Sequence, residues 1–177
     1  MLIGLAVRLV IPDTTAVSAR QALRQAGLHD LLDLRREECW GFAVDDGNTP
    51  QIIAERLLAT DILVNYNKHR GRWWEGPLAA AAPGDESPTQ HWGRLLVEDR
   101  DDPQPAHMQQ MLTARLGYTG IRVLRRATLW SVGVAAGADV ARVTQRAADL
   151  LLVNTHGQLA QLVSAGSGQY GGMPARQ

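Results

Sequence analysis

Apolar and polar residues alternate with different periods along the first part of the chain. Range 2–11 is largely apolar and contains β-branched residues, which indicates a β-strand. In range 13–26 the apolar positions recur at helical spacing, and Asp13, Thr14 or Thr15 can cap this helix. Gly27 follows at the place where a left-handed residue ends a helix. A strand followed by a helix is therefore predicted.

The next part of the chain predicts two short strands, a helix and a closing strand. Ranges 31–34 and 40–44 are the strands, and the polar range 35–38 is expected to form the turn between them. A Thr-Pro pair opens range 49–58, as N-cap and first helical residue, and apolar positions follow at helical spacing. Range 62–66 is then expected to close this half as a strand.

The second half of the chain repeats this order of predicted elements. The elements are a strand, a helix, two strands, a helix and closing strand segments, at 95–97, 105–116, 121–124, 129–134, 140–151, 152–153 and 159–163.

The two halves also match residue by residue when the sequence is shifted by ninety positions. Leu34-Arg35-Arg36 then meets Leu124-Arg125-Arg126, Trp40 meets Trp130, and Gly27 meets Gly117. A fixed internal period of this kind indicates a duplicated unit. We expect one module at 1–70, a linker at 71–92, a second module at 93–163 and a flexible tail at 164–177.

The order strand, helix, two strands, helix, strand is that of the ferredoxin-like layout. The predicted fold class is α+β, with two tandem ferredoxin-like (βαββαβ) modules related by a pseudo-twofold. Each module has only about seventy residues, so its core is marginal alone and its open sheet face needs a cover. The sheets of the two modules are therefore expected to cover each other.

The expected linker combines small residues, Pro and Gly, and it begins with two adjacent tryptophans. Trp73 and Trp74 could form an exposed contact patch, but we expect them to fold back onto the core.

Composition excludes several classes of protein. Eighteen basic residues balance eighteen acidic ones, and the net charge of zero disfavours a nucleic-acid binder. One cysteine excludes a disulfide framework. The first residues have neither the basic start of a signal peptide nor the length of a membrane span, so we expect a cytoplasmic protein.

The sequence shows no convincing catalytic, metal or cofactor site. Cys39 has two neighbouring glutamates and no visible base, so it is expected to be a packed strand residue. The five histidines lack metal-ligand spacing. A G-x-G-x-x-G pattern within 166–172 lies too close to the end to open the helix that a dinucleotide needs. No catalytic residue, metal or cofactor is therefore expected.

Basic residues form three candidate contact sites for a partner. Two of them, Arg35-Arg36 and Arg125-Arg126, lie at the same predicted hairpin corner in each half, and Lys68 and Arg70 form the third. Two interpretations stay open for the corners: a partner or phosphate contact across the pseudo-twofold, and a solvated turn balanced by nearby acids.

Several stretches carry motifs of a known family, at 27–35, 38–44 and 54–66 in the first half and at 102–104 and 116–125 in the second. Together they resemble the PurS family, the small subunit of phosphoribosylformylglycinamidine (FGAM) synthase. The chain departs from the family in three respects. It has two modules, it lacks a Gly-Lys pair in the central hairpin, and it has Asp61 in place of the proline of the closing motif.

The resemblance implies a non-catalytic subunit of de novo purine biosynthesis. PurS pairs with itself and bridges the large ATP-dependent synthetase subunit and the glutaminase subunit. A fused tandem would then be a covalent version of a PurS dimer, and whether it forms a further homo-oligomer stays open.

Two other classes of function remain. Paired ferredoxin-like domains of the ACT type bind a small metabolite at their interface, which would make this chain a regulatory protein. RNA binding on a sheet face would need exposed aromatic residues, and Trp40, Phe42 and Trp130 are expected to pack instead.

Overall fold

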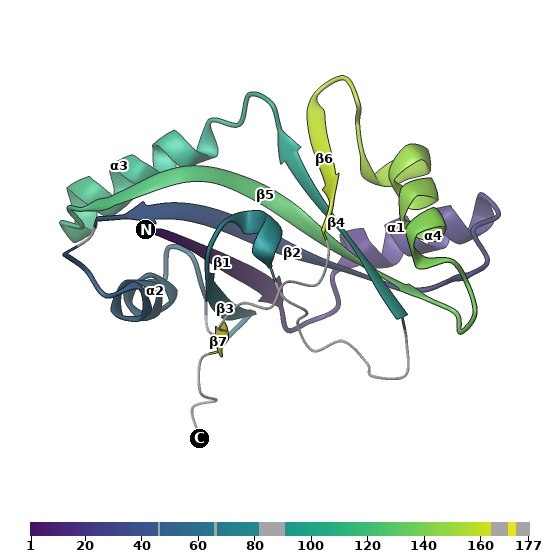
Figure 1. Ribbon diagram of the computed structural model, residues 1–177, viewed down its shortest axis with the longest axis horizontal. Helices are drawn as coiled ribbons and strands as arrows, with labels where there is room; N and C mark the ends of the chain where they lie inside the picture. The colour runs from purple at the N-terminus through teal and green to yellow at the C-terminus, as the bar shows by residue number, and fades with distance from the viewer. Residues whose placement is uncertain (46, 66, 82–90, 164–169, 173–177) are drawn as a thin grey trace.

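The computed structural model describes residues 1–45, 47–65, 67–81, 91–163 and 170–172. The chain is an α+β protein in which seven strands form one antiparallel sheet, in the order β6-β4-β5-β2-β1-β3-β7 (Figure 1). The elements follow in the order β1 (Leu2–Leu9), α1 (Thr14–Gln25), β2 (Leu31–Val44), α2 (Pro50–Leu58), β3 (His69–Glu75), a 3-10 turn η1 (Leu78–Ala80), β4 (His91–Asp99), α3 (Gln104–Leu116), β5 (Ile121–Val134), α4 (Val140–Ala147), a π-helical turn η2 (Ala148–Leu152), β6 (Gln158–Leu162) and β7 (Tyr170–Gly172).

The two long strands β2 and β5 form the centre of the sheet, and their bounds differ by ninety residues at both ends. Their register is symmetric: Arg36 lies opposite Trp130, and Trp40 lies opposite Arg126. β1 and β4 flank this pair, and β3 and β6 follow outside them. The expectation that two sheets cover each other is wrong, because pairing between β2 and β5 joins both halves into one sheet.

The polar turn expected at residues 35–38 is also wrong, because this range lies inside β2. Each residue from Arg35 to Glu38 has a partner on β5. Successive side chains of a strand alternate between the two faces of its sheet, so the four charged residues are shared between both. Asp33 binds Arg35 and Asp13 binds Arg36 by ion pairs. Backbone pairing and these ion pairs let a charged sequence continue as a strand, and β5 does the same through Arg125 and Arg126.

Four helices cover one face of the sheet and make two cores, each built from both halves of the chain. The α2–α3 core joins these two helices to β1, β3 and to parts of β2 and β5; its largest members include Leu5, Trp40, Phe42, Ile53, Leu57, Trp73, Met108, Leu112 and Ile121. The α1–α4 core joins the other two helices to β4 and to the remaining parts of β2 and β5; its members include Leu23, Leu31, Leu34, Leu95, Trp130, Val132, Val143 and Leu152. Helices from different halves therefore share each core.

The opposite face of the sheet, called here the reverse face, is covered near its centre by the segment that follows β3. Leu78 and Ala81 pack there with Cys39, Leu129 and other buried residues. Trp74 lies across Gly4, where an added Cβ would come within 2.2 Å of the indole ring. The prediction that the two tryptophans pack onto the core is confirmed, since Trp74 is fully buried and Trp73 is buried in the α2–α3 core.

The closing strands lie later in the chain than expected. Leu63 and Val64 are buried, but their N–H groups donate to the carbonyl of Thr60 in a turn, so residues 62–65 form no strand, and Tyr66 lies outside the described residues. β3 instead lies at His69–Glu75, mostly within residues expected as linker. In the second half, Leu152 ends a π-helical turn and β6 matches the later of the two expected segments.

The expected tail contributes one strand to the sheet. Tyr170–Gly172 pairs with β3, although these residues were expected to be flexible. The rest of the expected tail, with most of the glycine-rich motif at 166–172, and linker residues 82–90 lie outside the described residues.

Candidate functional site

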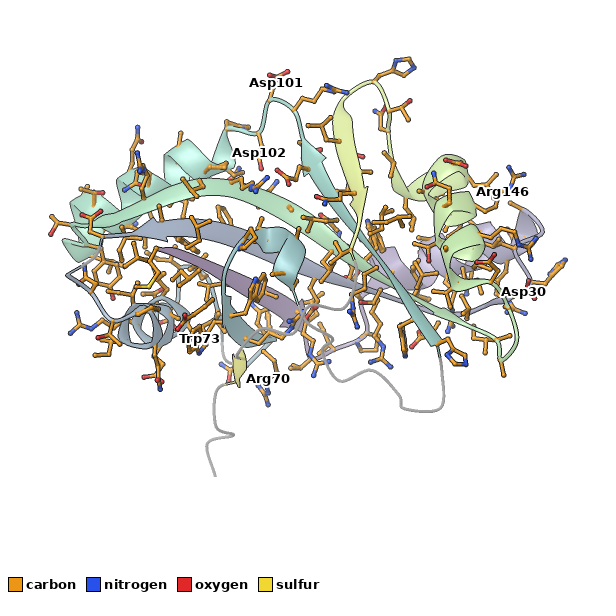
Figure 2. The ribbon with its side chains drawn as sticks, viewed as in Figure 1. Asp30, Arg70, Trp73, Asp101, Asp102 and Arg146 are labelled. Atoms are coloured by element: carbon orange, nitrogen blue, oxygen red, sulfur yellow. The ribbon has the colours of Figure 1, made fainter. Side chains whose placement is uncertain are left out.

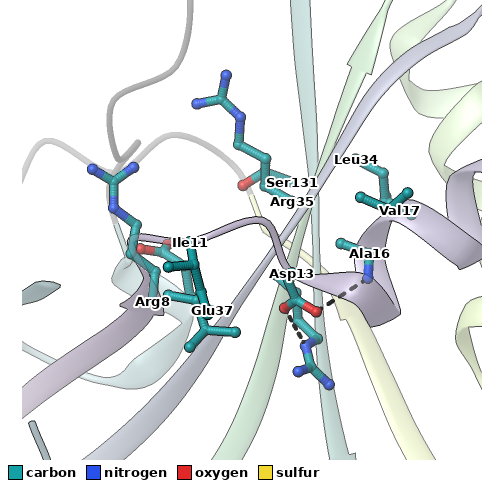
Figure 3. A pocket seen from close by; sticks show the side chains of 11 residues that line it. Arg8, Ile11, Asp13, Ala16, Val17, Leu34, Arg35, Glu37 and Ser131 are labelled. Atoms are coloured by element: carbon teal, nitrogen blue, oxygen red, sulfur yellow. Dashed lines mark hydrogen bonds and ion pairs between the residues drawn. The ribbon is translucent and has the colours of Figure 1, made fainter. Parts of the chain in front are cut away.

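A cavity of about 250 Å³ lies where β1 stops and β2 continues. β1 ends at Leu9, and its pairing with β2 runs only as far as Val7 opposite Glu38. The chain then leaves the sheet and enters α1, so none of the described strands pairs with the first part of β2 on that side. Figure 3 shows this gap lined by Arg8, Asp13, Arg35, Glu37 and Ser131. A second cavity of about 340 Å³ shares Arg8, Asp13 and Glu37 with the first.

Both carboxylates in the wall of the cavity hold cationic partners. Asp13 Oδ2 accepts from Arg36 Nε at 3.0 Å, and its Oδ1 accepts from the first amides of α1 as the N-cap. Glu37 is buried and accepts two hydrogen bonds from Arg72, at 2.6 and 3.2 Å. A two-pronged arginine–carboxylate pair of this kind fixes both groups in position.

Arg35 is held on the reverse face by contacts that include a carboxylate and an aromatic ring. Its Nε donates to Asp33 Oδ2 at 3.0 Å, and its guanidinium lies over the ring of Trp92, 4.8 Å from the ring centre. Ser131 lies directly opposite Arg35 on β5 and is only 5% exposed. Because Ser131 belongs to the second half of the chain, both halves contribute to the cavity.

The equivalent position in the second half is arranged differently. Arg126 Nε binds Asp102 Oδ2 at 2.8 Å, as Arg36 binds Asp13. Arg125, the equivalent of Arg35, binds Glu98 at 3.2 Å. The residue of β1 that corresponds to Glu98 is Arg8. The first half thus has two arginines where the second half has an arginine–glutamate pair.

The predicted site residues are not brought together as one surface. Arg35 and Arg36 line the cavity, whereas Arg125 and Arg126 lie with Glu98 and Asp102 in the other half. Figure 2 shows Asp102 and Arg70 on opposite sides of the molecule. Arg70 is exposed on β3 opposite Arg8.

Lys68 lies in the turn before β3, where its carbonyl accepts from the N–H of Val10.

Three residues that line the cavity, Arg8, Glu37 and Ser131, were not predicted as site residues from the sequence. Only Arg8 gave a signal in the sequence, because a charged residue there interrupts the apolar run of β1.

Cys39 is fully buried between the sheet and its reverse-face cover. Burial raises the pKa of its thiol, and the nearby Glu37 carboxylate raises it further. The thiol is therefore protonated in the folded state at neutral pH, as fits a packed strand residue. Among the described residues, no three His, Cys, Asp or Glu side chains are grouped so that they could hold a metal ion.

The aromatic residues considered for RNA binding are covered by helices. Trp40, Phe42 and Trp130 are all buried, in the two cores under α1 to α4. In the part of the chain that the structure describes, no helix combines the length and apolar character needed to cross a membrane.

Comparison with known proteins gives no family to which the chain can be assigned. No protein-family model matches the sequence, and no curated protein or solved structure matches it significantly.

Proposed function

We propose that this chain is a non-catalytic, PurS-like assembly subunit of an FGAM synthase, in which two fused halves take the place of a dimer. One observation carries the proposal: β2 and β5 pair in a register that is symmetric under exchange of the two halves. A closed twofold contact of this kind is the usual interface of a homodimer. Fusion of two copies would preserve it within one chain.

The shared cores add support and suggest how the fold arose. Each core combines the first helix of one half with the second helix of the other. One core contains α3 and α2, and the other contains α1 and α4. In this proposal each core is a ferredoxin-like unit, and the two units exchange their first helix and second strand. Residues 35–38, which were expected to form a hairpin turn, would be the place where the chain passes from one unit into the other.

The bridging role needs two surfaces related by the pseudo-twofold, one for the synthetase and one for the glutaminase. The side chain of Arg125 is half exposed, and Lys68 and Arg70 are exposed, so an acidic partner surface can reach all three, although Arg125 also binds Glu98. Arg36 and Arg126 each hold an aspartate at the start of a helix, and their replacement would disturb the fold.

The test is a reconstituted amidation assay with a matching synthetase and glutaminase. Addition of the chain should raise glutamine-dependent amidation and affect ammonia-dependent amidation less. The triple variant Lys68→Ala, Arg70→Ala and Arg125→Ala should bind the partners more weakly. Arg142→Ala is the control, because Arg142 is 71% exposed and distant from these residues in the sequence. Absence of a complex with the wild-type chain would refute the proposal.

A second candidate function, binding of a small metabolite between the halves, is favoured by the cavity beside β1. Its lining comes mostly from the first half, and Ser131 adds a polar group from the second. Small-ligand sites are concave and contain a few fixed polar groups. Thermal-shift measurements with amino acids and nucleotides separate this candidate from the first.

A further inference from the structure

We infer that the groove between α1 and η2 binds the unbranched alkyl chain of a neutral amphiphile, whose oxygen accepts a hydrogen bond from Trp130. This groove shares no lining residue with the cavity beside β1, so the inference goes beyond both proposed functions. Two observations carry it: the hydrogen bonding of one buried indole, and a difference in side-chain size between α1 and α3.

The groove has a volume of about 590 Å³ and is built from both halves of the chain. α1 lies beside α4 and η2, on the helix-covered face of the sheet (Figure 1). Hydroxyl side chains and alanines of α1 line the groove together with Leu151 and Leu152 of η2, and β5 contributes Trp130 from the sheet. The volume falls within the roughly 300–1,000 Å³ that is usual for small-ligand sites.

Trp130 is a buried donor without an acceptor. Within the described part of the chain its indole N–H has no hydrogen-bond partner, although the residue is only 7% exposed. The equivalent residue in the first half, Trp40, donates through Nε1 to Glu38 at 2.7 Å. Thr128 has the position of Glu38 in the second half, so the equivalent carboxylate is missing. Buried indole N–H groups usually have a partner, and a ligand oxygen in the groove would provide one.

Helices α1 and α3 can be aligned through the aspartates at their starts. Asp13 and Asp102 each bind an arginine and a backbone amide of the following helix. Ten residues after each aspartate, Leu23 and Leu112 are both buried in a core. The alignment therefore matches the faces that the two helices turn toward the sheet.

In this alignment two alanines of α1 replace two methionines of α3. Ala19 corresponds to Met108 and Ala22 to Met111. Met108 is buried in the α2–α3 core, whereas both alanines line the groove beside Trp130. Methionine is an unbranched apolar side chain, so an unbranched alkyl chain has the shape that fills the equivalent space. Burial of such a chain would supply the apolar contacts that Met108 supplies in the other core.

The lining also limits the charge and the length of the ligand. The described residues that line the groove carry no charge, and burial of an ionised group without a partner is costly. The hydroxyls of Thr14, Thr15 and Ser18 can donate to an uncharged polar head or accept from it. Thr14 and Ala22 are eight residues apart, about 12 Å along the helix axis, which is roughly the length of an extended decyl chain. A neutral head at the start of α1 and an octyl or decyl chain toward Ala22 fit this space.

Isothermal titration calorimetry of the full chain tests the inference, with octanamide, octanoate and octylammonium as probes. The three probes share one alkyl chain and differ in their heads. Octanamide should bind saturably and more tightly than either charged probe, because its head has an acceptor oxygen and no charge.

Ala19→Met should weaken octanamide binding by at least about tenfold, because the new side chain fills the groove. It should also raise the midpoint of urea unfolding, which shows that the variant is folded. Gln21→Met is the control, since it adds the same side chain at an exposed position of α1 outside the groove. Its affinity for octanamide should equal that of the wild type.

Trp130→Phe keeps an aromatic ring and removes the N–H donor, and it should weaken octanamide binding several-fold. Trp40→Phe, the equivalent change in the first half, should leave the affinity unchanged. No saturable binding of octanamide, or equal affinity in Ala19→Met and Gln21→Met, would overturn the inference. Equal affinity in the two Trp→Phe variants, or tighter binding of a charged probe, would overturn the hydrogen bond to a neutral head. Complex formation with a synthetase and a glutaminase involves none of these substitutions, so the two proposals are tested separately.

Discussion

Glu38 and Thr128 are equivalent positions of the repeat, and they lie directly opposite each other on β2 and β5. A residue faces its own equivalent only where a twofold axis passes between two antiparallel strands. The pairs on either side follow the same rule, with Cys39 opposite Ala127 and Glu37 opposite Leu129. The centre of this sheet therefore has the geometry of a dimer interface within one chain.

The first half alone should form a homodimer. In a fragment of residues 1–90, two copies of β2 can pair around Glu38, and each α1 can pack on the other copy's sheet. Without that pairing, Leu23, Leu31 and Leu34 would lose the core that they share with the second half. Size-exclusion chromatography with light scattering should give twice the fragment mass.

A stable, soluble monomer of the fragment would show that the first half does not need the exchange. Proteolytic cleavage of the full chain within residues 82–90 gives the complementary measurement. The two pieces should stay associated in native buffer and separate only in denaturant, because both cores contain side chains from each half.

Gly4→Ala should destabilise the protein strongly. The new methyl group would lie 2.2 Å from the Trp74 ring, which is fully buried and whose Nε1 donates to the carbonyl of Pro77. Overpacking of this kind costs about 1–3 kcal/mol. The measurement is the midpoint of urea unfolding.

Gly47→Ala is the matched control for this substitution. Among the described residues other than its chain neighbours, no atom lies within 4 Å of a Cβ added at Gly47, and the φ of Gly47 is outside the left-handed region. Its midpoint should stay near that of the wild type or rise slightly. Equal loss of stability in both variants would mean that Trp74 does not lie against Gly4.

The two aspartate–arginine pairs should stabilise the helix starts in parallel ways. Asp13→Ala removes the cap of α1 and its ion pair, and a cost of about 1–2 kcal/mol is expected. A double-mutant cycle with Arg36→Ala isolates the pair, with a coupling of about 0.5–1 kcal/mol. The Asp102–Arg126 pair should give a similar value. Zero coupling energy in both cycles would show that these ion pairs do not stabilise the starts of α1 and α3.

Local patterns in the sequence predicted the helices well. Asp13 caps α1, and Gly117, with φ of 65°, ends α3 as its left-handed residue. These features depend on backbone geometry within a few residues, so the sequence carries them directly. The ninety-residue repeat likewise predicted that elements recur in the same order.

Contacts between the halves could not be predicted in this way. Residues 35–38 resemble a turn by composition, and they form a strand because β5 pairs with each of them. Range 62–66 is apolar like a strand, yet Leu63 and Val64 fill the core as a turn. Of the candidate site, Arg35 and Arg36 were found by repetition, whereas Ser131 reaches the cavity only through the pairing of β2 with β5.

Cys39 should make stability fall at high pH. Burial and the Glu37 carboxylate raise the pKa of the thiol in the folded state, while in the unfolded chain it stays near its ordinary value of about 8.5. Below that value both states hold the proton and pH has no effect through this group. Above it the unfolded state loses the proton and the folded state keeps it, so unfolding becomes easier by about 1.4 kcal/mol per pH unit.

The measurement compares the free energy of unfolding of the wild type with that of Cys39→Ala between pH 7 and about 10.5. At pH 7 the variant should be less stable by about 1–3 kcal/mol, because it leaves a small cavity beside Leu129. With rising pH the difference should shrink, since only the wild type has this thiol to titrate. Tyrosines and Lys68 are common to both proteins, so their contributions cancel. Two curves that stay parallel over this range would show that the thiol ionises as easily in the folded chain as in the unfolded one.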